Sequence, residues 1–205
     1  MPLKFANNQS LTATTSLPSA VPTDNLILIS TQTASSSASI SFTSGLNSTY
    51  DEYLITFINI HPSADSAFKF NFSTDGGATY AVTKTSTMFR AYHFETDIGT
   101  ALQYLTAEDL AQSTSDDFLH ASYGSESDHS LSGSLQIFAP SSTTYVKHYI
   151  ARVNGVENSG SNDLTVDYYK AGYCNTTSAI NAVKFLNSTG NIDDGIFKLY
   201  GVKKS

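Results

Sequence analysis

The run from Phe68 to Phe72 alternates strictly between aromatic and polar residues. Phe68, Phe70 and Phe72 therefore share one side of an extended chain, whereas Lys69 and Asn71 point to the other side. A period of two is typical of a β-strand that is buried on one face only. The sequence thus predicts a half-buried strand here, with Asn71 on its polar side.

The preceding run, residues 53–60, is apolar on both of its faces. One face carries Leu54, Ile58 and Ile60, and the other carries Tyr53, Ile55 and Phe57. Such a run is typical of a strand at the centre of a sheet, covered on both sides by the same chain or by a neighbouring one. We therefore expect a central strand here, joined to the next strand through residues 62–65.

Further strand-like runs follow at hairpin-like spacing along residues 25–205, without alternating helices. The last run, from Ile196 to Val202, is apolar on both faces, which indicates a strand inside the sheet. We count roughly eight to ten strands from such runs and the turn residues between them. This pattern favours an all-β antiparallel β-sandwich of jelly-roll type over an α/β fold.

The first 24 residues differ from the rest of the chain, because they combine small polar residues with two prolines and show no sustained apolar period. We expect an extended N-terminal arm over residues 1–24 and a β-sandwich domain over residues 25–205. Four apolar residues are the candidate anchors of this arm on a neighbouring subunit: Leu3, Phe5, Leu11 and Leu17. A free terminus is the alternative.

Composition limits the classes of partner. Only 14 % of the 205 residues are charged, the net charge is −7, and the 11 Lys and Arg residues are scattered. Nucleic acid is therefore not an expected partner, because phosphate binding needs clustered cations. No apolar run is long enough for membrane insertion, and MPLKFANNQS lacks the apolar core of a signal peptide, so we expect synthesis in a cytoplasm. The single cysteine, Cys174, is expected to be a buried free thiol.

The sequence contains no phosphate-binding loop, nucleophile elbow, or metal-binding pair of histidines or cysteines. His93 and His129 each have acidic neighbours, but solvated loops explain both groups better than a metal site does. Four tyrosines could stack on sugars or pack in the core: Tyr92, Tyr168, Tyr169 and Tyr173. We expect no catalytic residue, no cofactor and no metal.

Two segments are candidates for surface-binding loops. Residues 97–117 are the least strand-like part of the chain, and TALQYLTAEDLAQS within them is compatible with a short helix or with a long loop. Residues 154–163 are polar. The candidate binding residues in the two segments are Tyr104, Glu108, Asp109, Asn158 and Asn162.

Several segments together resemble small β-sandwich virion proteins of tailed bacteriophages that infect marine bacteria. These segments are LKFANNQSL, ISTQTASSSASISFTSG, FINIHP, SSTTYVKH, AGYCNTTSAI and the ending GNIDDGIFKLYGVK. The resemblance spans nearly the whole chain, and its motifs are turn and strand residues. It implies a fibre, knob or decoration protein and supplies no catalytic residue.

The resemblance implies a non-enzymatic structural protein in the virion, displayed as a tail fibre, as a receptor-binding component or as a decoration or fibre on the head. Other virion proteins would be its partners, a homotrimer its assembly, and a host-surface glycan or protein a further contact. A lectin-like carbohydrate-binding module is the alternative. A polysaccharide-degrading enzyme would need two paired acids, and nothing in the sequence selects such a pair.

Overall fold

The residues described by the computed structural model, 25–160 and 162–203, form twelve β-strands and no helix. The strands are β1 (Leu26–Ser37), β2 (Ile40–Phe42), β3 (Glu52–Pro62), β4 (Ser66–Ser73), β5 (Lys84–Phe94), β6 (Thr100–Tyr104), β7 (Asp117–Tyr123), β8 (Leu131–Phe138), β9 (Lys147–Asn158), β10 (Asp163–Cys174), β11 (Ala182–Asn187) and β12 (Ile192–Val202). The predicted arm and its anchors Leu3, Phe5, Leu11 and Leu17 lie outside the described residues.

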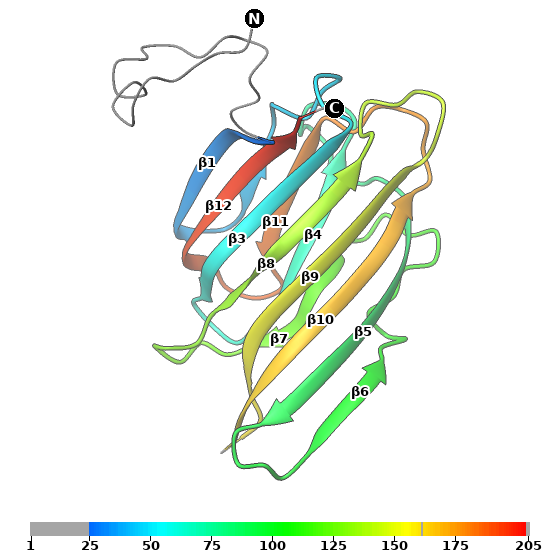
Figure 1. Ribbon diagram of the computed structural model, residues 1–205. Coiled ribbons are helices and arrows are strands. Elements are labelled where there is room, and N and C mark those ends of the chain that lie inside the picture. Colours follow the sequence, from blue (N-terminus) through cyan, green and yellow to red (C-terminus); the bar gives the residue numbers. More distant parts are fainter. Residues whose placement is uncertain (1–24, 161, 204–205) are drawn as a thin grey trace, which may run out of the picture.

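The strands form two antiparallel sheets of unequal size. The large sheet has eight strands in the order β1-β12-β3-β8-β9-β10-β5-β6, and the small sheet has four in the order β2-β11-β4-β7. Figure 1 shows the small sheet behind the middle of the large sheet, while β5 and β6 extend beyond it. The predicted all-β antiparallel sandwich is confirmed, with the strands divided eight to four.

Phenyl rings from both sheets fill the centre of the core. Phe68 of β4 stacks on Phe185 of β11 with ring centroids 5.9 Å apart and packs edge-on against Phe57 of β3 at 5.3 Å. Phe197 of β12 completes the group, 6.2 Å from Phe68. All four side chains are fully buried. The aromatic side of β4 therefore attaches the small sheet to the large one.

Strand β3 is central, as predicted, because it pairs with β12 on one edge and β8 on the other. The prediction that Ile60 shares a face with Leu54 and Ile58 is wrong. The register shifts between Phe57 and Ile60, and Asn59 has a φ of 51°. This β-bulge turns Ile60 into the core, so only Leu54 and Ile58 remain on the opposite face.

The polar side of β4 is also buried, which differs from the half-buried strand that the alternation predicts. Asn71 is 1 % exposed and Ser73 is fully buried. The side-chain amide of Asn71 donates to the carbonyl oxygens of Tyr80 and Thr114, so segments beyond the end of β4 cover this side. A period-two pattern cannot reveal a cover that comes from elsewhere in the chain.

Residues 97–117 contain the edge strand β6 followed by a loop, so the alternative of a short helix is wrong. The loop follows the edge of β5 through main-chain hydrogen bonds from Leu105 N to Met88 O and from Ser86 N to Leu110 O. Because the loop continues the pairing along β5, most of that edge is not open.

Removing the central ring of the core is expected to destabilise the domain strongly. Phe68→Ala should lower the free energy of unfolding by about 3–5 kcal/mol, because it leaves a cavity between the sheets. Ile98→Ala is the control, since Ile98 is 66 % exposed in a loop and should change stability little. Urea unfolding of both variants measures the difference, and equal midpoints would contradict this description of the core.

Candidate functional site

The outer face, defined as the side of the large sheet that faces away from the small sheet, carries most of the exposed apolar side chains. Ten large hydrophobic side chains are exposed among the described residues, and eight of them belong to this face: Leu26, Leu28, Ile58, Phe89, Leu102, Tyr104, Ile150 and Ile196. Alternation with buried residues places Phe89, Ile150 and Ile196 outward. The register aligns the exposed residues of β1 and β6 with outward residues of β12 and β5. Surfaces of this kind mark sites of interaction.

One row of side chains crosses the β6 half of this face. The register aligns Tyr104 of β6 with Phe89 of β5, Tyr169 of β10 and Arg152 of β9. The rings of Phe89 and Tyr169 stack with centroids 4.8 Å apart and an interplanar angle of 4°. The guanidinium carbon of Arg152 lies 5.1 Å from the centroid of the Tyr169 ring. The row thus combines flat apolar surface with a cation.

Asp167 holds the polar end of this row in place. Its carboxylate accepts hydrogen bonds from Arg152 Nε at 3.0 Å and Nη2 at 2.7 Å, and from the Tyr169 hydroxyl at 3.0 Å. Through these bonds, Asp167 raises the pKa of Arg152 and of Tyr169 above their usual values. Arg152 therefore stays charged, and its planar guanidinium group is fixed beside the aromatic rings.

A shallow depression of about 330 Å³ lies beside this row. Its lining comes from β5, β8, β9 and β10: Thr87, Phe89, Ser134, Gln136, Ile150, Ala151, Arg152, Tyr169, Lys170 and Ala171. The lining combines small residues with two rings, an arginine and an amide. Such a surface can stack on a flat apolar group and donate hydrogen bonds to hydroxyls, which suits binding.

The first group of predicted surface-binding residues lies at the β6 end of this row. The Tyr104 hydroxyl donates a hydrogen bond to Asp109 and accepts one from Thr87 Oγ1 at 3.2 Å. The main-chain oxygen of Glu108 accepts a hydrogen bond from Lys170 Nζ at 2.8 Å. The structure therefore brings Tyr104 and Asp109 together at the edge of the outer face, whereas the Glu108 oxygen contacts the buried Lys170 on the inner side of the sheet.

The second group, Asn158 and Asn162, lies elsewhere, at the β9–β10 hairpin. Asn158 ends β9 and donates a hydrogen bond to Glu126, and the Asn162 main-chain oxygen accepts one from Ser159 N at 3.1 Å. The predicted loop over residues 154–163 is shorter than expected, because β9 continues to Asn158. Gly155 lies inside β9. A Cβ there would lie 2.7 Å from His120 Nε2, so close packing explains this glycine.

The four tyrosines considered for sugar stacking separate into two pairs. Tyr169 and Tyr173 point to the outer face, whereas Tyr168 is fully buried and Tyr92 packs against the buried cluster around Met88. Tyr168 belongs to a polar network beneath the large sheet, which sequence patterns did not indicate. The one sequence signal that could have separated Tyr168 from Tyr169 is alternation along β10, because successive residues of a strand point to opposite faces.

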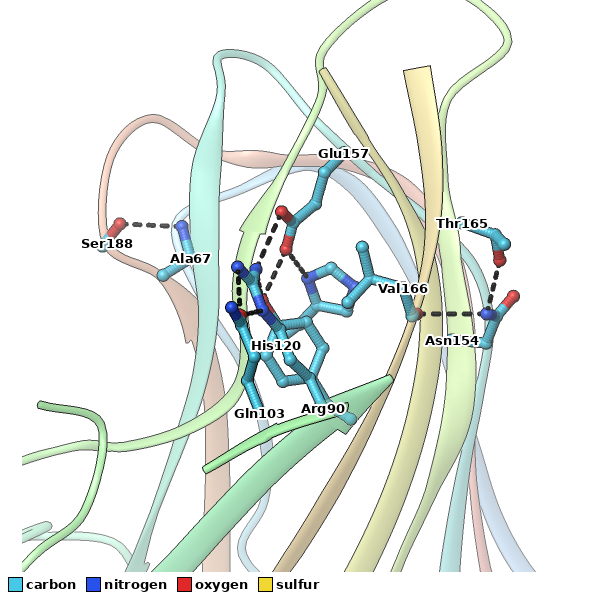
Figure 2. Close-up of polar contacts among 10 residues, drawn as sticks. Ala67, Arg90, Gln103, His120, Asn154, Glu157, Thr165, Val166 and Ser188 are labelled. Carbon is cyan, nitrogen blue, oxygen red and sulfur yellow. Dashed lines mark hydrogen bonds and ion pairs between the residues drawn. The ribbon is translucent and has the colours of Figure 1, made fainter. Parts of the chain in front are cut away.

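This buried network joins β7 to the large sheet (Figure 2). Arg90 Nη1 lies 3.2 Å from Glu157 Oε2, Tyr168 donates a hydrogen bond to Glu157 Oε1, and His120 Nδ1 lies 4.0 Å from Glu157 Oε1. Burial raises the pKa of Glu157 and lowers the pKa of His120 to about 3. Because the side chains of His120 and Tyr168 are closed off from solvent, we assign the network a structural role.

The histidines with acidic neighbours have different surroundings. His93 forms an exposed pair with Asp97 at 3.0 Å. His129 is only 5 % exposed and lies 2.8 Å from Glu126 Oε2 and 3.2 Å from Asp163 Oδ2, so it attaches its loop to the start of β10. Within residues 25–160 and 162–203, no group of three or more His, Cys, Asp or Glu side chains could hold a metal ion.

Comparison with protein-family models, with curated proteins and with solved structures finds no match to this chain. In the part of the chain that the structure describes, no helix has the length and apolarity needed to cross a membrane. A functional assignment therefore depends on the sequence and on the outer face.

The buried histidine is expected to make the fold sensitive to acid. The pKa of His120 is about 3 in the folded chain and 6.5 when exposed, so only the unfolded chain takes up this proton between those values. Stability should therefore fall as pH decreases from 6.5 to 3, by up to about 1.4 kcal/mol per pH unit. His120→Phe should flatten this dependence in urea unfolding from pH 7 to pH 4.

His148→Asn is the control, because His148 is exposed and should leave the pH dependence unchanged. All three proteins retain Glu157, so the difference between their slopes reports on the histidine. Equal slopes for the wild type and His120→Phe would show that His120 is not held neutral.

Proposed function

We propose that this chain is a non-enzymatic structural protein of a tailed-phage virion, displayed at the particle surface as a tail fibre or receptor-binding component, or as a head decoration. The observation that carries the proposal is the outer face, where eight of the ten large hydrophobic side chains that are exposed in the described part of the chain are gathered. The resemblance of the turn and strand segments to phage virion proteins supports the assignment to a phage particle.

The outer face suits assembly because its apolar side chains spread from β1 to β6. At one end, Ile196 of β12 pairs with Ile58 of β3, and Leu28 of β1 pairs with Tyr200. Monomeric proteins rarely expose apolar patches larger than a few hundred Å². A second subunit packed on this end would remove that surface from water, and a closed trimer is the assembly that we propose.

The two ends of the outer face have different chemistry, which supports a division of roles. The β1 end carries aliphatic side chains and follows directly after residues 1–24, the proposed attachment arm. The β6 end carries the stacked rings of Phe89 and Tyr169 with Arg152 beside them. We assign the β1 end to contacts within the virion and the β6 end to contacts with the host surface.

A charge at the β1 end should prevent assembly. Leu28 is 52 % exposed on the outer face, so Leu28→Asp should leave the monomer folded and shift sedimentation from the oligomer to the monomer. Tyr145→Asp is the control, because it adds the same charge at a loop position that is 75 % exposed and lies outside the outer face. A wild-type chain that stays monomeric at all concentrations and is missing from assembled particles would contradict the proposal.

A lectin-like carbohydrate-binding module is the second candidate, favoured by the stacked pair of Phe89 and Tyr169 beside the depression. If the β6 end binds sugars, Tyr169→Ala should weaken binding by about two- to tenfold, since an aromatic contact contributes roughly 0.5–1.5 kcal/mol. Tyr145→Ala, at a loop position that is 75 % exposed, should have no effect. A glycan array without signal for the wild type would exclude this candidate and leave the first unaffected.

A further inference from the structure

Two reactive side chains from different sheets meet in the interior of the domain. Lys84 is the first residue of β5 in the large sheet, and Asn71 lies in β4 of the small sheet. Lys84 is fully buried and Asn71 is 1 % exposed. Lys84 Nζ lies 2.6 Å from Asn71 Oδ1. A buried primary amine thus contacts a buried carboxamide, with water excluded from both.

We propose that Lys84 and Asn71 form an intramolecular isopeptide bond that joins the two sheets covalently. The Nζ–Cγ bond forms, the Cγ–Nδ2 bond of the asparagine breaks, and one amine proton ends on Nδ2, which leaves as ammonia. Neither carbon nor nitrogen changes oxidation state, so no oxidant, reductant or cofactor is required. The proposal does not depend on the function proposed above.

The surroundings of Lys84 favour the nucleophilic form of its amine. Burial lowers the pKa of Lys84, because a charged ammonium is poorly solvated inside the domain. The neutral amine has the lone pair that attack on a carbonyl carbon requires. Nζ also donates a hydrogen bond to Val82 O at 2.8 Å, which keeps the side chain beside β4.

Other charged and titratable groups act on this amine. Asp116, Asp117 and Cys174 favour its charged form, and Lys170 opposes it, but desolvation by burial is the largest influence. Asp117 is itself paired with Lys170, whose Nζ lies 2.7 Å from Asp117 Oδ1. The carboxylate with the largest effect on the Lys84 amine is therefore already paired with another cation.

The carboxamide of Asn71 is held with its carbonyl toward the amine. Its Nδ2 donates to Tyr80 O, Thr114 O and Asp116 Oδ1 at 3.0, 3.1 and 2.9 Å. Its Oδ1 accepts a hydrogen bond from the main-chain N–H of Phe72 at 2.9 Å. That N–H would stabilise the negative charge that develops on Oδ1 during attack, as an oxyanion hole does.

The distances are close to those of a reacting pair. A carbonyl bond is about 1.23 Å long, so the contact between Nζ and Oδ1 places Cγ within roughly 3.9 Å of the amine. Reacting atoms in well-oriented pairs are separated by about 3–3.5 Å. The amine therefore lies within about 1 Å of the separation at which such pairs react.

Asp116 is positioned to transfer the proton. Its Oδ1 contacts Nδ2, and once the amine has added to Cγ both nitrogens are bound to the same carbon. The carboxylate can then take the proton from Nζ and deliver it to Nδ2, which makes ammonia the leaving group. Asp116 is half-buried and Thr114 is exposed, so ammonia has a short path to solvent.

The other fully buried lysine outside an ion pair lacks such a partner. Lys147 Nζ donates to the main-chain oxygen of Thr176 at 3.1 Å and has no carboxamide side chain among its hydrogen-bond partners in the described residues. The structure therefore singles out Lys84 as the reactive lysine and supplies Lys147 as a matched control.

The proposal is tested by mass spectrometry of the purified, denatured full-length chain. We expect a mass lower than the sequence mass by one ammonia. Trypsin should not cleave after the modified Lys84, so residues 70–90 should appear as one fragment, also lighter by one ammonia. Cleavage before Asp75 should open this loop and leave both pieces joined. A full-length chain with the unmodified sequence mass would overturn the proposal.

Variants separate this bond from cyclisation of Asn71 on its own main chain, which also releases ammonia. Lys84→Arg should retain the full sequence mass, whereas Lys147→Arg should still lose one ammonia. If Lys84→Arg loses ammonia, or if trypsin cleaves after Lys84 in the lighter chain, the proposal is wrong.

Asp116→Ala tests the proton transfer. Asp116 is only half-buried, so the variant should fold, which circular dichroism checks, and a large fraction of the chain should remain unmodified. Complete modification in folded Asp116→Ala would overturn the role that we give to this carboxylate.

Discussion

The packing of four phenyl rings between a sheet of eight strands and a sheet of four is the contact on which the rest of the structure depends. Phe68 touches rings from both sheets, Phe57 and Phe197 from the large one and Phe185 from the small one. Since period two places every second residue of β4 inward, this contact also sets which side chains point away from the core. The small sheet covers one face of the large sheet, and the outer face keeps its apolar residues exposed.

Polar groups are also buried inside the domain. Lys170 pairs with Asp117 at 2.7 Å, and the Tyr149 hydroxyl donates to the same carboxylate at 2.7 Å. Burying such groups is unfavourable unless each finds a partner, and an ion pair in the interior is weak evidence for stability. We infer that these contacts specify how β5, β9 and β10 are placed over β4 and β7. The Lys84–Asn71 pair also lies between the two sheets, and the proposed isopeptide bond would make its contact covalent.

Sequence periodicity predicted the fold well where strands are long and apolar. The central position of β3 and the internal position of β12 follow directly from runs that are apolar on both faces. The prediction failed at Ile60, because the bulge at Asn59 adds a residue that no apolar pattern signals. Periodicity also failed to identify β6, for which a helix and a loop were the two alternatives. An edge strand with exposed residues need not alternate between apolar and polar side chains.

The candidate site was only partly accessible from the sequence. Tyr104 and Asp109 were selected as loop residues and lie at the edge of the outer face, but Phe89 and Arg152 were not selected, because their alignment depends on the order of β5, β10 and β9. Strand order is a long-range property that one sequence does not reveal. The pairing of Glu157 with Arg90 was missed for the same reason.

The sequence by itself determined an all-β domain and the aromatic side of β4, because side-chain alternation is a local property of an extended chain. Only the tertiary structure decided that Asn71, on the polar side of that strand, is buried beside Lys84. The physical reason is that burial depends on what folds over a residue, and here the cover comes from Tyr80 and Thr114, outside β4.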